Sequence, residues 1–169
     1  MSMMSIRAAT PRDRAAIRTV DENAFGQKAE AGLVDALIRS ADVVLELVAE
    51  DEGSVVGHIL FSRLYVERNG VRTPAVALAP LAVEPSFHGT GIGGALVREA
   101  HLRLKAAGEA LSIVLGDPGY YGRFGYSHAR AAGFESDYQC DALQALAWSD
   151  APEDGRLLHA EPFRTQLAA

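Results

Sequence analysis

The sequence predicts an α/β (α+β) protein in which a mixed, mostly antiparallel sheet is flanked by helices. Three observations predict this class. Two amphipathic helical segments come first, three strand-like segments joined by tight turns follow, and a strand–loop–helix–strand unit comes next. The chain has 169 residues, enough for one domain with a full hydrophobic core. We therefore expect residues 1–169 to form a single domain.

Composition and charge limit the classes of function. The chain is 49% hydrophobic and 22% charged, as in ordinary globular proteins. No apolar run approaches the roughly 18 residues that span a bilayer, and residues 1–5 lack the apolar core of a signal peptide. We therefore expect a cytoplasmic protein with no membrane partner. The net charge of −6 argues against nucleic acid as a partner. The single cysteine, Cys140, excludes an internal disulfide; we expect a small buried hydrophobic residue, with a catalytic thiol as the alternative.

The first part of the chain is interpreted as one short strand, residues 5–9, and two helices. Thr10-Pro11-Arg12-Asp13 is typical of a helix start, because threonine caps, proline suits the first turn and aspartate complements the helix dipole. Gly26 ends this helix. A second helix is predicted over residues 29–39 from the spacing of its apolar residues.

Three consecutive antiparallel strands are predicted next, over residues 43–50, 54–66 and 71–83. These segments are rich in β-branched residues, with aromatics in the second. Asp51-Glu52-Gly53 is expected to turn the chain between the first two strands. Asn69-Gly70 is a strong signal for a two-residue hairpin between the second and the third.

Pro80 interrupts the third of these strands. Proline cannot donate a hydrogen bond to a sheet ladder and is confined to edges and bulges. We therefore expect the strand to bend at Pro80 or to part from its neighbour there. The backbone groups of Leu81, Ala82 and Val83 would then be free to pair with something other than protein.

The rest of the chain begins with a βαβ unit. A helix is predicted over residues 92–107, ended by Gly108, and residues 111–115 are a continuous apolar run typical of a buried parallel strand. Three elements follow. Residues 120–126 are predicted to form a short helix or turn that leads into a strand, residues 138–148 are ambiguous between strand and helix, and residues 156–160 form a last strand.

A glycine-rich run, His88-Gly89-Thr90-Gly91-Ile92-Gly93-Gly94, precedes the βαβ helix. Glycines let the backbone approach a ligand closely, and amides at a helix N-terminus favour phosphate. The run also matches G-x-G-x-x-G, the dinucleotide fingerprint, but too little chain remains for the doubly wound sheet of that fold. Asp117, at the end of the next strand, keeps the NAD hypothesis open. A glycine turn with no ligand is the other alternative.

Two motifs resemble the GCN5-related N-acetyltransferases, the GNAT superfamily. Leu81-Ala82-Val83-Glu84-Pro85 followed by the glycine run is similar to motif A of that family, Q/R-x-x-G-x-G/A at a helix start. Tyr121-Gly122-Arg123-Phe124-Gly125-Tyr126 is similar to its Y-x-x-x-G-F. The order of elements also agrees: two helices, three antiparallel strands, a βαβ unit and a final strand pair. The resemblance covers roughly residues 6–126.

A narrower resemblance points to bacterial acetyltransferases of the YhbS type. It rests on Asn23-Ala24-Phe25-Gly26 together with Gly116-Asp117-Pro118 and the tyrosine-rich motif. The family resemblance implies the acyl-CoA N-acyltransferase fold, with its sheet splayed at a cofactor cleft. It also implies an N-acetyltransferase that moves an acetyl group from acetyl-CoA directly to a primary amine of a small molecule, protein or peptide.

The resemblance also implies which residues bind acetyl-CoA. The pantetheine arm would pair with Leu81 and Val83 like an added strand, and the amide of Leu81 or Ala82 would polarise the thioester carbonyl. The pyrophosphate would lie on the backbone amides of the glycine run. These amides belong to His88, Gly89, Thr90, Gly91, Ile92, Gly93 and Gly94.

Tyr121 is the catalytic residue that the resemblance implies. Its hydroxyl would donate to the leaving thiolate. A thiol has a pKa near 8.5 and tyrosine near 10, so complete proton transfer is uphill by roughly 1.5 pKa units, or ~2 kcal/mol. A hydrogen bond that strengthens as the thiolate forms is sufficient. Tyr120 is the rival, but its register to Gly125-Tyr126 is one residue off.

The sequence departs from the family at His88, where the motif has Gln or Arg, so any side-chain contact to phosphate would depend on pH. Asp117 stands near a position where many relatives carry asparagine. Two candidates for the general base stay open, Glu22 and a water relay. If Glu22 is only the solvated end of a helix, it has no such role.

No metal site is expected, because no His, Cys or carboxylate has metal-ligand spacing with His88. The acceptor amine is not identified, and a homodimer stays open. Two alternatives remain: a coenzyme A-binding module without catalysis, and an NAD-dependent enzyme.

Overall fold

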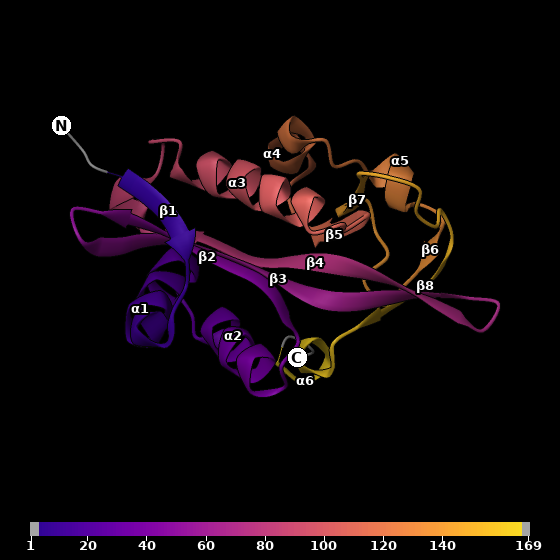
Figure 1. Ribbon diagram of the computed structural model, residues 1–169, viewed down its shortest axis with the longest axis horizontal. Coiled ribbons are helices and arrows are strands. Elements are labelled where there is room, and N and C mark those ends of the chain that lie inside the picture. Colours follow the sequence, from indigo (N-terminus) through magenta and orange to yellow (C-terminus); the bar gives the residue numbers. More distant parts are fainter. Residues whose placement is uncertain (1–3, 167–169) are drawn as a thin grey trace.

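The computed structural model describes residues 4–166. Eight strands form one mixed sheet in the order β1-β2-β3-β4-β5-β7, with β8 paired to both β3 and β6. Helices cover both faces of this sheet (Figure 1). The predicted class, a mostly antiparallel mixed sheet flanked by helices, is confirmed. Within the described range, no helix has the length and hydrophobicity needed to cross a membrane.

The bounds of the elements follow the sequence pattern closely in the first two thirds of the chain. The strands are Met4–Ala8 (β1), Val43–Asp51 (β2), Ser54–Arg68 (β3), Val71–Val83 (β4), Leu111–Leu115 (β5), Phe134–Glu135 (β6), Leu143–Ala147 (β7) and Gly155–His159 (β8). The helices are Arg14–Phe25 (α1), Ala29–Arg39 (α2), Ile92–Ala106 (α3), Pro118–Tyr121 (α4), His128–Ala131 (α5) and Glu161–Gln166 (α6). Short 3₁₀ turns are Pro11–Asp13 (η1), Pro85–Phe87 (η2) and Gly122–Phe124 (η3).

The N-terminal helix begins and ends as the sequence predicts. Thr10 and Asp13 form a capping box, and the Asp13 carboxylate also accepts hydrogen bonds from Arg7 at 2.8 and 2.9 Å. The hydrogen bond from Arg7 holds the pKa of Asp13 well below its usual range. Gly26 ends the helix in the left-handed conformation, with φ of 66°. The corner between α1 and α2 is therefore fixed by local sequence.

Strand β4 contains the irregularity that Pro80 predicts. Its pairing with β3 shifts register between Ile59 and Phe61, which face Leu81 and Leu78, so β4 carries one extra residue around Pro80. Parallel pairing with β5 covers only Val76–Leu78 on the β4 side. The two strands therefore part beyond Leu78, and the sheet is splayed at its centre.

The last third of the chain differs from the predicted strand pair. β7 pairs antiparallel with β5, whereas β8 pairs with Leu64–Glu67 of β3, beyond the part of that edge that β2 occupies. The expected pairing of these two final strands is wrong, because each joins a different earlier strand. Two short helices, α5 and α6, were also not predicted. Cys140 is exposed, not buried as expected, because it lies in a turn between β6 and β7.

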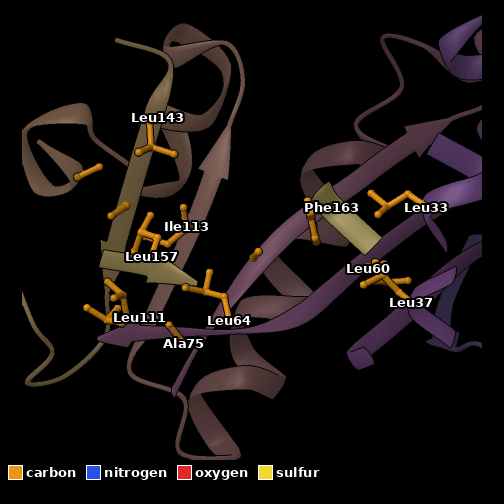
Figure 2. Packing of buried hydrophobic residues seen from close by; sticks show 14 of the residues in the cluster. Leu33, Leu37, Leu60, Leu64, Ala75, Leu111, Ile113, Leu143, Leu157 and Phe163 are labelled. Carbon is orange, nitrogen blue, oxygen red and sulfur yellow. The ribbon is translucent and has the colours of Figure 1, made fainter. Parts of the chain in front are cut away.

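The two faces of the sheet carry separate hydrophobic cores. On one face α1, α2 and α6 cover residues such as Leu60 and Leu64, and Figure 2 shows Phe163 of α6 beside Leu33 of α2. On the other face α3 packs onto the sheet. This packing is close, since a Cβ at Gly57 would lie 3.0 Å from side-chain carbons of two α3 residues.

Candidate active site

The glycine run forms the N-terminus of α3. Gly91 is the residue that precedes the helix, and its φ of 86° is one that residues with side chains rarely adopt. An added Cβ at Gly91 would meet nothing within 4 Å, so the loop borders open space. The amides of Ile92, Gly93 and Gly94 lie in the first turn, where a helix provides no partner for them. Such a terminus attracts anions.

Two amides of the predicted phosphate site are already used by the loop. His88 donates its amide to the carbonyl of Pro85 at 3.2 Å, and Thr90 donates its amide to that of Phe87 at 3.3 Å. The His88 ring is also engaged, since its Nε2–H donates to the carbonyl of Val83 at 2.8 Å. These contacts shape the turn. The remaining candidates for binding phosphate are the backbone amides of residues 89 and 91–94.

A cleft of about 690 Å³ opens beside this loop and is called the larger cleft below. Pockets that hold cofactors fall in the range of about 300–1,000 Å³. Its walls come from the end of β4, from the loop and from the segment after β5. The β4 residues that line it are Leu81, Ala82 and Val83, and the loop residues include His88, Gly89, Gly91, Ile92, Gly93 and Gly94. Of the predicted cofactor residues, Thr90 does not line it.

The two neighbouring tyrosines take different positions. A Cβ at Gly93 would lie 2.6 Å from the Tyr120 hydroxyl, so Tyr120 lies over the loop. A Cβ at Gly116 would lie 2.6 Å from the ring of Tyr121, so Tyr121 packs on the end of β5. Both glycines therefore leave room for the tyrosine side chains that cover them. The sequence did not single out Gly116, although it belongs to the narrower motif.

Burial, with a smaller contribution from Tyr120, raises the pKa of Tyr121 to about 12. The phenol therefore stays protonated at any ordinary pH and acts as a hydrogen-bond donor. Complete proton transfer to a thiolate is further uphill than ordinary pKa values suggest. The geometry suits a donated hydrogen bond rather than a transferred proton.

Two arginines at the larger cleft were missed by sequence reasoning. The guanidinium of Arg123 lies 4.6 Å from the centroid of the Tyr120 ring, and that of Arg98 lies 5.2 Å from the centroid of Phe124. Neither arginine has an ion pair among the described residues. Their charge is therefore available to phosphate groups. The alternation of aromatic residues and arginine in the segment after β5 is the sequence pattern that could have indicated a binding role for arginine here.

A second cavity, called the smaller pocket below, has a volume of about 220 Å³. It lies where β4 and β5 part, and three residues line both cavities: Phe25, Leu81 and Tyr121. Its other walls come from α2, β5 and the C-terminal segment, residues 127–166. These walls are mainly apolar, with Leu33, Ile113, Tyr138, Leu143 and Phe163 among them. The smaller pocket and the larger cleft therefore meet at Tyr121.

Two acidic residues that the sequence analysis considered lie outside both cavities. The side chain of Asp117 accepts a hydrogen bond from the amide of Gly119 at 2.9 Å and caps α4. Glu22 lies within α1 and lines neither cavity. Glu30 of α2 is the carboxylate found among the residues of the smaller pocket, and the sequence did not indicate it.

A buried polar network lies behind the β4 end of the larger cleft. His58 pairs in register with Ala82, and its ring contacts Asp21 at 3.0 Å and Glu46 at 2.7 Å. Burial by itself lowers the pKa of His58, but the hydrogen bonds and charges of the two carboxylates outweigh it and raise that pKa. Arg14 forms a second ion pair with Glu46. The network joins α1 to β2 and β3.

Comparison with known proteins identifies the family. A family model described as an acetyltransferase (GNAT) domain matches residues 5–129, well over half of the chain. The chain belongs to the GNAT acetyltransferase family. The uncharacterized N-acetyltransferase YjhQ of Escherichia coli K12 is 36% identical over 163 residues, which cover 90% of each chain. The uncharacterized N-acetyltransferase YhbS of the same strain is 36% identical over 148 residues, covering 83% of this chain and 87% of YhbS. The resemblance to YhbS-type GNAT proteins is confirmed.

Solved GNAT structures share the fold. A GNAT family acetyltransferase from Brucella melitensis, in complex with acetyl-CoA, has a TM-score of 0.81 and 36% identity over 95% of this chain and 98% of its own. YhbS from Escherichia coli, in complex with CoA, has a TM-score of 0.89 and 31% identity over 97% of this chain and 93% of its own. The similarity thus extends past residue 129 into the C-terminal segment.

Proposed function

We propose that this GNAT protein is an acetyl-CoA-dependent N-acetyltransferase that acetylates a primary amine by direct transfer. The observation that carries the proposal is the junction of two cavities at Leu81 and Tyr121. One cavity offers a helix N-terminus and two arginines to phosphate groups, and the other offers an apolar space to an acceptor. A reaction between two substrates needs such a meeting point.

The residues of the junction have distinct roles in this proposal. The amides at positions 89 and 91–94 bind the pyrophosphate. The edge of β4 at Leu81 and Val83 pairs with the amides of the pantetheine arm, although the Val83 carbonyl already accepts one hydrogen bond from His88. The amide of Leu81 or Ala82 donates to the thioester carbonyl as negative charge develops there. The neutral amine nitrogen attacks this carbonyl carbon and loses a proton to water as the new carbon–nitrogen bond forms. The carbon–sulfur bond breaks, its electron pair leaves with sulfur as a thiolate, and Tyr121 donates a hydrogen bond to that thiolate.

The same proposal covers what surrounds the site. We propose that residues 1–169 act as one domain, because β7 and β8 of the C-terminal segment join the sheet and the segment supplies walls of the smaller pocket. A cytoplasmic location remains a prediction from the sequence, which also leaves a homodimer open. The acceptor is a small-molecule or peptide amine, and the next subsection narrows this class.

Calorimetric titration tests the coenzyme. Acetyl-CoA is expected to bind the protein, and NAD is expected to show no comparable binding. The opposite result would overturn the assignment. The structure offers NAD little support, since parallel pairing occurs only between β4 and β5 and between β6 and β8 among the described strands.

A coenzyme A-binding module without catalysis is the second candidate. It is favoured by one observation: Glu30 is the only carboxylate among the described residues that line either cavity, so no general base is evident. A broad screen of primary amines, followed by the release of free thiol from acetyl-CoA, separates the two candidates. Thiol release with any amine supports the enzyme, and binding of acetyl-CoA without release supports the module.

A further inference from the structure

The smaller pocket contains one unexplained polar group, the imidazole of His159. Both ring nitrogens are buried, and neither has a hydrogen-bond partner among the residues that the structure describes. The ring centroid lies 5.3 Å from that of Tyr138 and 5.0 Å from that of Phe163. A buried polar group without a partner lowers stability, so it calls for an explanation in terms of function.

His159 differs in this respect from every other histidine of the chain. The chain has five histidines, all within the described range. The other four each have a hydrogen-bond partner within the protein: His58, His88, His101 and His128. The lack of a hydrogen-bond partner among the described residues therefore sets His159 apart from the other histidines. The ring nitrogens are shielded in the pocket as it stands, so a ligand would supply this partner once the ring turns toward the space.

The register of the sheet places His159 at the end of the pocket that is remote from the junction. His159 pairs with Leu64 of β3, which pairs on its other side with Ala75 of β4. Leu81, at the junction, lies beyond the bulge further along β4. Residues that face each other across a ladder project to the same side. His159 therefore projects to the face of Leu64, which α2 and α6 cover.

Most of the residues that line the smaller pocket are apolar. Figure 2 shows them in two groups, with Leu33 and Phe163 on one side and Ile113 and Leu143 on the other. A volume of about 220 Å³ is below the usual range for ligand sites of about 300–1,000 Å³, so the occupant is small. The carboxylate of Glu30 is the one formal charge among the lining residues at neutral pH, which favours a cation over an anion.

The ring of His159 is neutral, because burial lowers its pKa to about 4. A neutral imidazole offers one N–H donor and one nitrogen acceptor. A hydroxyl group can satisfy either of them, whereas a methyl group satisfies neither. The chemistry of the pocket is therefore an apolar passage that ends in a hydrogen-bonding group.

We propose that the acceptor is a small primary amine with an apolar body and a distal hydroxyl or similar hydrogen-bonding group, and that His159 is the specificity-determining residue that receives this distal group. The assignment rests on the proposed function, since it takes the junction at Tyr121 as the place of the amine. It gives β8 and α6 a role in substrate choice.

Two matched pairs of amines test the proposal. Tyramine and phenethylamine differ by one hydroxyl, as do 6-amino-1-hexanol and hexylamine. Calorimetric titration of each amine into the protein loaded with coenzyme A measures binding without any need for turnover. In the wild type we expect the hydroxylated member of at least one pair to bind about 5- to 10-fold more tightly, the effect of one net hydrogen bond.

Three variants assign this preference to a residue. In His159→Leu the preference falls to about 1 or reverses, whereas His159→Gln, which keeps a donor and an acceptor, retains most of it. His101→Gln is the control. His101 is a half-buried histidine whose pKa is lowered to about 4 by burial and by Lys105, and it lies outside the pocket. It is expected to keep the wild-type preference.

Several results would overturn the proposal. These are equal affinities within both pairs in the wild type, an unchanged preference in His159→Leu, or a lysine-containing peptide that binds more tightly than any of the four amines. Thiol release from acetyl-CoA is measured with the same amines. A binding preference that depends on His159, without thiol release, supports the specificity pocket and contradicts the proposed enzyme. Failure of the specificity proposal and failure of the proposed function therefore give different results.

Discussion

The two cavities that meet at Tyr121 are built in different ways. Nearly all residues that line the larger cleft come from three short segments between Leu81 and Phe124, and the end of α1 adds the rest. The smaller pocket is assembled from α2, β4, β5, β8 and α6, which are widely separated in the sequence. If the larger cleft binds the coenzyme and the smaller pocket binds the acceptor, as we propose, then coenzyme binding is encoded locally and acceptor binding depends on the whole fold. A local motif can be recognised in a sequence, but an assembled pocket requires the three-dimensional structure.

Each cavity also has its own buried histidine, and the two have opposite environments. His58, behind the larger cleft, lies between two carboxylates that raise its pKa. His159, in the smaller pocket, has no partner among the described residues, and burial lowers its pKa to about 4. The contrast fits our proposal that His159 serves a ligand, whereas His58 joins elements of the fold. The predictions below test this contrast and the separate roles of the two cavities.

The largest expected effect is the loss of stability in His58→Gln. This change leaves the buried carboxylates of Asp21 and Glu46 without the imidazolium between them. Removing one partner of a buried ion pair costs about 3–5 kcal/mol in the free energy of unfolding. His159→Gln is the matched comparison and is expected to cost about 1 kcal/mol or less, because no hydrogen bond within the protein is lost. Urea denaturation of both variants measures the difference, and equal costs would contradict the contrast.

The same network predicts how stability depends on pH. A histidine whose pKa is raised by folding contributes stability fully below its unfolded-state pKa of about 6.5 and loses it as pH rises through the folded-state value. We therefore expect the difference in free energy of unfolding between the wild type and His58→Gln to shrink above about pH 6.5. Denaturation curves from pH 6 to pH 9 measure it. A difference that grows with pH would refute a protonated His58.

The next largest effect is expected in the larger cleft for Gly91→Val. Gly91 needs a positive φ, and a valine there would turn the amides of the loop away and enter the space beside them. We expect the affinity for coenzyme A to fall by about 100-fold or more, which is ~2.7 kcal/mol. Gly108→Val is a close control, because Gly108 has a φ of 88° and also has nothing within 4 Å of an added Cβ. A similar loss of affinity in both variants would mean that general strain is the cause.

Tyr121→Phe is expected to have an intermediate effect, at the junction of the two cavities. The change removes the hydrogen bond to the leaving sulfur, so kcat with an identified amine should fall by about 10- to 100-fold, with little change in the affinity for coenzyme A. Tyr120→Phe is the control, since its hydroxyl lies over Gly93 and not at the junction. It should alter coenzyme affinity more than kcat. An unchanged kcat in Tyr121→Phe from pH 7 to pH 10 would exclude the assigned role.

The fold and the site could be predicted from the sequence as far as local signals reach. The ends of α1 and α2, the hairpin at Asn69-Gly70, the irregularity at Pro80 and the glycine run all depend on residues close together in the chain. The pairing of β8 with β3 could not be predicted, because it joins residues about 90 positions apart. Helices of four to six residues, such as α5 and α6, are too short to show a helical period. His159 became a candidate only once these elements were in place.

The smallest expected effect concerns the two arginines of the larger cleft. If Arg98 and Arg123 bind the phosphates of coenzyme A, replacing either by glutamine should weaken binding by about 3- to 10-fold at low salt and by less at 0.5 M salt, because salt screens exposed charges. Arg103→Gln is the control, since Arg103 lies on the same helix but is paired with Glu99 at 2.9 Å. Pantetheine, which lacks the nucleotide and its phosphates, should bind all of these variants equally. A loss of pantetheine affinity in these variants would show that the arginines act through the shape of the cleft. Phosphate binding and acceptor binding would then be less clearly separated than the two cavities suggest.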